Sequence, residues 1–174
     1  MFKHRDISFE CLEDGVTSPD NYYLLSIPRI YSKLYQIFEG NESYIPEDYH
    51  LLVLAFEKMY KGVCKELQAL HPDKIKFSDI VYTNGHRFSQ FAATIDNFIP
   101  ISGSSDGYQK VVDKLHEIEL DCNDTRYTKE KSLEEFRSDY KRFEIALDRF
   151  LKVLENEYGK MIESEEEEED LKNW

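Results

Sequence analysis

Cysteine and tryptophan are scarce in this 174-residue sequence, which contains three cysteines and one tryptophan. Cys11, Cys64 and Cys122 are odd in number and far apart, and no Cys-x-x-Cys or Cys/His spacing occurs. The sequence therefore predicts neither a disulfide framework nor a zinc site. Cys64 and Cys122 lie within apolar helical patterns, so we expect buried thiols and a cytoplasmic protein.

Long apolar runs are also absent. No stretch of 18 apolar residues occurs, and the mean hydropathy is −0.61. We therefore expect no membrane span. The first eight residues carry charges where the apolar part of a secretory signal would lie, so we expect no signal peptide.

Basic residues are outnumbered by acidic ones, 22 to 35, and the net charge is −13. Residues 163–170 hold seven acids and no base, and without these seven the net charge is still −6. An acidic surface repels phosphate backbones, so we expect no general binding to nucleic acids. We interpret residues 163–174 as a solvated acidic tail. The alternative is a nucleic-acid mimic that occupies the basic groove of a partner.

Apolar residues make up 41% of the chain and aromatic residues 14%, which suffices for a core. They recur at spacings of three and four, which is the pattern of amphipathic helices. These patterns predict helices over 18–39, 47–70, 86–96, 106–121 and 129–162. We therefore expect an all-α fold, an up-down bundle of four or five helices within 18–162, after an irregular segment, 1–17.

Local signals predict where the helices begin, bend and end. Ser18 followed by proline favours a helix start. Pro28 should kink the first helix or split it after Ser26. Thr128 is the expected cap of the last helix, without a capping box. Beyond Tyr158 acids accumulate at a helix C-terminus, where the macrodipole disfavours them, so we expect fraying there.

Three short motifs in the region 47–158 occur in a suggestive order. They are Ala-Phe-Glu-Lys-Met-Tyr-Lys at 55–61, Gly-His-Arg-Phe at 85–88 and Asp-Thr-Arg-Tyr-Thr at 124–128. Together they resemble the HEPN family of small helical bundles. The chain departs from the family pattern at Arg87, where an acid is usual, and at Thr128, where proline is usual. The resemblance implies either a partner subunit of a nucleotidyltransferase or a ribonuclease.

The histidines disfavour the ribonuclease. Nuclease members of the family carry Arg-x(4–6)-His, and none of the five histidines here lies five to seven residues after an arginine. No imidazole is then placed to move a 2′-hydroxyl proton. We therefore expect a non-catalytic HEPN-like bundle that binds a nucleotide or a partner protein, such as a nucleotidyltransferase in a toxin–antitoxin or defence setting. The alternatives are an HEPN ribonuclease or toxin with a displaced active site, and the acidic mimic.

Four residues are the candidate nucleotide site. Arg126 can hold a phosphate by paired hydrogen bonds, and Tyr127 can stack on a base. His86 and Arg87, at the start of a predicted helix, are candidate further contacts. The structural alternatives are an Arg126–Asp124 pair between two helices and a histidine that fixes a loop. The sequence predicts no cofactor, since it has no Walker loop or Gly-x-Ser-x-Gly elbow, and it leaves a homodimer open.

Polar residues outside the apolar stripes are expected to face water. Glu47 with His50, and Asp113 with His116, imitate the Glu-x-x-His motif of di-iron bundles. Asp113 and His116 fall off the apolar stripe, Glu47 sits at a helix start, and further inward carboxylates are missing. We therefore expect no metal site. Lys58 and Lys61 also lie off the apolar stripe and are expected to be solvated.

Overall fold

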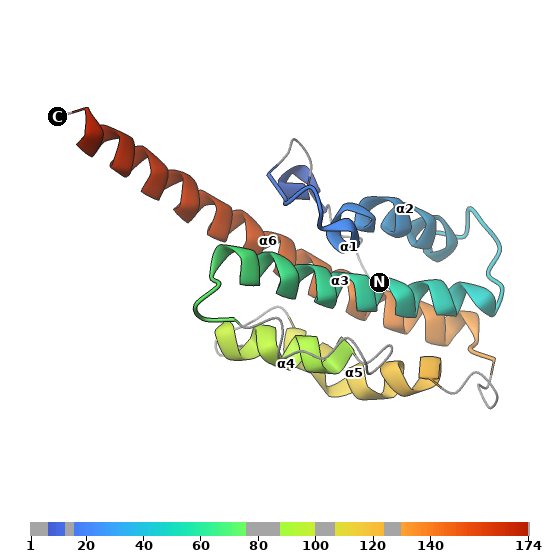
Figure 1. Ribbon diagram of the computed structural model, residues 1–174. Helices are drawn as coiled ribbons and strands as arrows, with labels where there is room; N and C mark the ends of the chain where they lie inside the picture. Colours follow the sequence, from blue (N-terminus) through green and yellow to red (C-terminus); the bar gives the residue numbers. More distant parts are fainter. Residues whose placement is uncertain (1–6, 13–15, 76–87, 100–106, 124–129, 174) are drawn as a thin grey trace.

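The protein is described by a computed structural model over residues 7–12, 16–75, 88–99, 107–123 and 130–173, with only the backbone described for 120–123. These residues form helices and no strand, which confirms the all-α bundle. In chain order the elements are a single turn η1 (Glu10–Leu12), then α1 (Tyr22–Leu25), α2 (Ile27–Phe38), α3 (Glu47–Leu70), α4 (Phe88–Phe98), α5 (Tyr108–Asn123) and α6 (Leu133–Lys172) (Figure 1).

The long helices α3 and α6 form the centre of the bundle. The N-terminal helices α1 and α2 pack on α3 from one side, and α4 and α5 lie on the other (Figure 1). Where the helices meet, aromatic rings fill the space. Phe56 of α3 contacts Phe88 of α4 and Phe143 of α6, with ring centroids 5.9 Å and 5.3 Å apart. All three rings are fully buried, so this junction is part of the core that the apolar stripes predict.

The helices do not alternate strictly up and down. Phe88 at the start of α4 stacks on Tyr60, and Phe98 at its end contacts His71, which follows α3. The helices α3 and α4 therefore run in the same direction, contrary to a simple up-down order.

The kink predicted at Pro28 is observed as a break between two helices. Helix α1 ends at Leu25, Ser26 lies between the helices, and Pro28 is in the first turn of α2. The start predicted at Ser18 is wrong. Asn21 caps α1 instead, because its side-chain oxygen accepts a hydrogen bond from the backbone N–H of Leu24.

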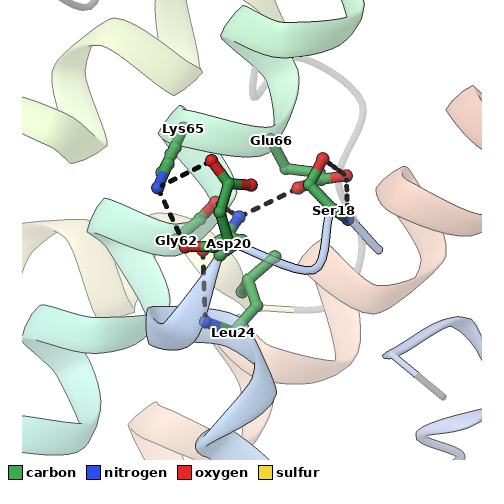
Figure 2. Close-up of polar contacts among 7 residues, drawn as sticks. Ser18, Asp20, Leu24, Gly62, Lys65 and Glu66 are labelled. Atoms are coloured by element: carbon green, nitrogen blue, oxygen red, sulfur yellow. Dashed lines mark hydrogen bonds and ion pairs between the residues drawn. The ribbon is translucent and has the colours of Figure 1, made fainter. Parts of the chain in front are cut away.

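Ser18 has a different partner, the buried Glu66 of α3. The backbone N–H and hydroxyl of Ser18 donate to Oε1 of Glu66, each at 3.1 Å, and the amide of Asn21 donates to Oε2 at 2.9 Å. At the same place Lys65 contacts Asp20 (Figure 2). These bonds satisfy a carboxylate that is only 2% exposed and hold the start of α1 against α3.

The segment before α1 takes part in the core, although the sequence predicts it to be irregular. Cys11 and Leu12 are buried, and the Cys11 thiol lies 3.9 Å from the backbone oxygen of Leu151 in α6. Thr17 donates to the backbone oxygen of Cys11 and lies 3.2 Å from the Tyr158 hydroxyl. The described part of residues 1–17 therefore packs on α6.

A buried carboxylate also joins α2 to α6. Glu144 accepts hydrogen bonds from the hydroxyls of Tyr31 and Tyr140 at 3.0 Å and 2.9 Å. Burial raises the pKa of both tyrosines well above the usual value, so both remain hydrogen-bond donors at any ordinary pH.

Helix α6 begins later and ends later than the sequence predicts. Its cap is Ser132, whose hydroxyl accepts from the N–H of Glu135, while the Glu135 side chain accepts from the N–H of Ser132. This is the capping box that was not expected, and Thr128 lies outside the described residues. The expected fraying beyond Tyr158 is also wrong, since α6 continues to Lys172. Glutamate is a good helix former, and this offsets the unfavourable macrodipole.

Candidate functional site

The structure does not describe the positions of the four predicted site residues. His86, Arg87, Arg126 and Tyr127 all lie outside the described residues. The nucleotide site therefore stays a prediction. Their nearest described neighbour at α4 is Phe88, which is buried in the core.

A groove lies beside Lys131 and Ser132, where the chain enters α6. It has a volume of about 490 Å³ and runs between α5 and the first turns of α6. Lys131 lies over the ring of Tyr49, 5.4 Å from its centroid, and Arg142 donates to Asp139 at 2.6 Å. The hydroxyl of Tyr49 donates to the same carboxylate at 2.6 Å. The lining includes four carboxylates and three cations, so the groove does not favour an anion.

The most perturbed acid among the described residues is Asp96, near the end of α4. Burial raises the pKa of Asp96 to about 6, although the Arg149 guanidinium and the Tyr108 hydroxyl both lower it. The hydroxyl of Tyr108 lies 3.4 Å from Asp96 and 3.1 Å from the hydroxyl of Tyr60. Arg149 stacks on the Tyr108 ring at 4.5 Å. The Asp96 carboxyl therefore lies beside the Tyr108 hydroxyl, which in turn contacts the Tyr60 hydroxyl.

The expectation that Lys61 is solvated is wrong. Lys61 is 8% exposed and contacts Glu57 at 2.5 Å one turn earlier on α3. Its ammonium also lies 5.7 Å from the centroid of the Phe91 ring. Packing of α4 against α3 covers this face, so this ion pair within α3 is buried where the two helices meet.

No metal centre is found in the described part of the chain. No group of three or more histidine, cysteine and acidic side chains there is close enough to hold a metal ion. Glu47 and His50 are exposed at the start of α3. Asp113 and His116 are exposed on α5, as expected from their positions off the apolar stripe. No helix among the described residues has the length and apolar character needed to cross a membrane.

The end of α6 is the most distinctive surface of the described protein. Tyr158 is its last buried residue, and residues 159–173 are all exposed. Figure 1 shows this part, which we call the projecting segment, extending away from the other helices. Where it leaves the bundle, a second groove of about 380 Å³ lies between the end of α3 and α6. Ala69, Leu70 and Met161 supply its apolar lining.

The two cysteines whose side chains are described show no sign of reactivity. Cys11 and Cys64 are buried and form no disulfide. Burial raises the pKa of the Cys11 thiol to about 11 and that of Cys64 to about 12, so both remain protonated at neutral pH. The side chain of Cys122 lies outside the described residues.

No family model, curated protein or solved structure matches the chain. The HEPN resemblance therefore stays a prediction based on three short motifs.

Sequence reasoning missed the groove at the end of α3. The signal was present, because the apolar stripe of α6 extends past Tyr158 to Met161, whereas α3 ends at Leu70. The axial register of α3 against α6 decides how far α6 extends beyond the end of α3. The apolar patterns of the two helices, taken separately, do not predict this register.

Proposed function

We propose that this chain is a non-catalytic helical bundle that binds a partner protein through the projecting segment, residues 159–173. The observation that carries the proposal is the exposure of this segment on all its faces. A helical segment outside a bundle has no tertiary packing, which is what stabilises most helices in proteins. Like charges three or four residues apart weaken it further. A partner that covers the segment removes both penalties.

Apolar side chains on the segment support a protein as the partner. Met161, Ile162 and Leu171 are 38%, 49% and 77% exposed on an otherwise acidic helix. Contacts of this kind are typical of helix recognition by a protein groove. They contribute little to binding a small polar ligand.

The HEPN resemblance makes a nucleotidyltransferase the first partner to test, in a toxin–antitoxin or defence setting. The motifs at 55–61, 85–88 and 124–128 are its support. A nucleotide is the corresponding small ligand, with Arg126, Tyr127, His86 and Arg87 as the residues to substitute.

A nucleic-acid mimic is the second candidate, and the helical geometry of the acidic residues favours it. Residues 163–170 carry seven carboxylates on one continuous helix. At a rise of about 1.5 Å per residue, this is roughly one charge per 1.7 Å of axis, about the density of duplex DNA. A protein groove that binds DNA would meet a comparable line of negative charge.

Truncation separates the projecting segment from the bundle as the binding surface. The chain and a version lacking residues 160–174 are each used to recover partners from the native host, with candidate partners then tested as pure proteins. We expect the full chain to bind and the truncated chain to lose binding. Because the truncation leaves the buried core residues in place, the loss reports on the missing segment and not on unfolding of the bundle. Undiminished binding by the truncated chain would contradict the proposal.

Salt distinguishes the two candidates. Apolar contacts with a protein partner resist screening, so affinity should fall less than about tenfold between 0.05 and 0.3 M salt. A mimic should lose far more and should be displaced by duplex DNA.

The absence of catalysis is tested with labelled RNA, with and without chelator. We expect no cleavage. Dose-dependent cleavage that survives repurification and disappears in Arg126→Ala would show a ribonuclease. Calorimetry with ATP and AMP tests the nucleotide: binding that Arg126→Ala and Tyr127→Ala abolish would establish that site, and no heat for either ligand would exclude it.

A further inference from the structure

One face of α6 continues beyond the end of α3, the helix that packs beside it. Leu154 and Tyr158 are buried in the bundle, and Met161, Glu165 and Glu168 follow on the same face at spacings of three and four. Helix α3 runs parallel to α6, since Tyr49 contacts Asp139 near the start of both helices and His71 contacts Glu157 farther along. Because α3 ends at Leu70, no helix of the described residues lies beside this face of α6 after Tyr158.

The groove at this point has an apolar lining and an acidic far end. Leu70 and Met161 line it beside α3, and Glu165 and Glu168 line it farther along α6. Neither of these two glutamates forms an ion pair with a described residue. By contrast, Glu157 at the near end contacts both His71, at 2.6 Å, and Lys160, at 3.6 Å.

The end of α3 adds to the negative potential. The last carbonyl groups of a helix carry the partial negative charge of its macrodipole, and α3 ends at the groove. No basic side chain precedes this end in the last turn of α3. A cationic group in the groove would therefore be attracted from two directions, by the α3 terminus and by the carboxylates of α6.

We infer that this groove binds a cationic amphipathic helix of a partner protein, positioned along α6 where α3 has ended. Its apolar side chains contact Leu70 and Met161, and its lysine or arginine side chains contact Glu165 and Glu168. A second copy of this chain fits poorly, because each copy carries a net charge of −13. The inference rests on the proposed function and specifies the chemistry of the partner.

Two matched pairs of variants test the groove. Glu165→Gln/Glu168→Gln removes two charges within it, and Glu163→Gln/Glu167→Gln removes two charges from the same helix outside it. Met161→Ser removes an apolar contact, and Ile45→Ser makes a similar change at an exposed residue that precedes α3, outside both the groove and the projecting segment. All of these side chains are exposed, so the bundle should keep its thermal stability in every variant.

The probe is a fluorescent peptide of about 18 residues, with leucines at helical spacing of three and four and lysines elsewhere, measured by anisotropy. A scrambled peptide of the same composition is the charge control. We expect Glu165→Gln/Glu168→Gln to weaken binding about tenfold or more, and Met161→Ser about fivefold. The control variants should change affinity by less than about threefold, and the scrambled peptide should bind at least about tenfold more weakly.

Equal effects of the two double variants, or equal binding of the two peptides, would show unspecific charge attraction and overturn the inference. The inference would also be overturned if the patterned peptide did not bind at about 100 μM. The host partner then separates this inference from the proposed function. If truncation at 160 abolishes partner binding but the groove variants keep it, the groove is wrong and the proposed function stands. If the truncated chain still binds, the proposed function itself fails.

Discussion

Gly62 of α3 lies against Leu24 of α1 so closely that a Cβ on Gly62 would come within 2.7 Å of the Leu24 Cγ. The same Cβ would be 3.0 Å from the Leu24 backbone nitrogen, so rotating one side chain would not remove the clash. The carbonyl of Gly62 also accepts a hydrogen bond from Asn21 at 3.0 Å. A glycine at this position allows the N-terminal helices to approach α3 closely.

Gly62→Ala should therefore destabilise the protein. Overpacking in a tight core costs about 1–3 kcal/mol, and the helix-propensity gain of about 1 kcal/mol offsets only part of it. We expect a net loss of about 1 kcal/mol in the free energy of unfolding, measured in urea. Gly159→Ala is the control, because its Cβ would meet nothing within 4 Å, and it should be neutral or slightly stabilising. Equal stability of Gly62→Ala and the unchanged chain would show that α1 can move away.

Periodic patterns predicted most of the helical fold. Helix α3 has the predicted bounds, 47–70. The described bounds of α4 and α5 lie within two residues of the predicted bounds, 86–96 and 106–121. The break at Ser26 followed from proline chemistry alone. These features depend on local sequence, which explains why they could be predicted.

Features that depend on packing could not be predicted. Lys61 lies off the main apolar stripe of α3, but a second helix covers its face and buries it with Glu57. The parallel course of α3 and α4 depends on the connection 71–87, which has no pattern that fixes a direction. The candidate site depended on family motifs at 85–88 and 124–128, and its four residues lie outside the described chain, so that prediction is still to be tested.

The cap of α6 offers a second prediction. Ser132→Ala removes the acceptor for the Glu135 N–H and should cost about 1 kcal/mol of unfolding free energy. Ser132→Asp keeps an acceptor and should stay within about 0.5 kcal/mol of the unchanged chain. The measurement is urea unfolding followed by far-UV circular dichroism. If both substitutions are neutral, the helix does not depend on this cap.

Asp96 should make stability depend on pH. Its pKa is raised from 3.8 to about 6 in the folded protein, so between these values the folded state binds more protons than the unfolded state. The contribution of Asp96 to stability is then fully present below about pH 4 and lost as the pH rises through 6. Carboxyl-carbon NMR should show Asp96 titrating near pH 6, with Asp96→Asn identifying the signal.

Arg149 provides the check on the cause of this shift. Its charge lowers the pKa of Asp96, so Arg149→Gln should raise that pKa further. If Asp96 titrates near pH 4 in the unchanged chain, burial does not control its pKa.

The projecting segment should respond to salt in the absence of any partner. Its glutamates lie three and four residues apart, and each such like-charge pair costs a few tenths of a kcal/mol at low salt. Raising the ionic strength from about 0.01 to 0.15 M shortens the screening length from roughly 30 to 8 Å, which weakens this repulsion. Amide hydrogen exchange in residues 160–172 should therefore become slower as salt is added.

Residues 136–154 of the same helix, which pack in the core, are the internal control and should change little. Fast exchange in the segment that does not depend on salt would contradict this prediction. It would show that helix propensity alone does not keep residues 160–172 helical, and that they become helical only with the partner.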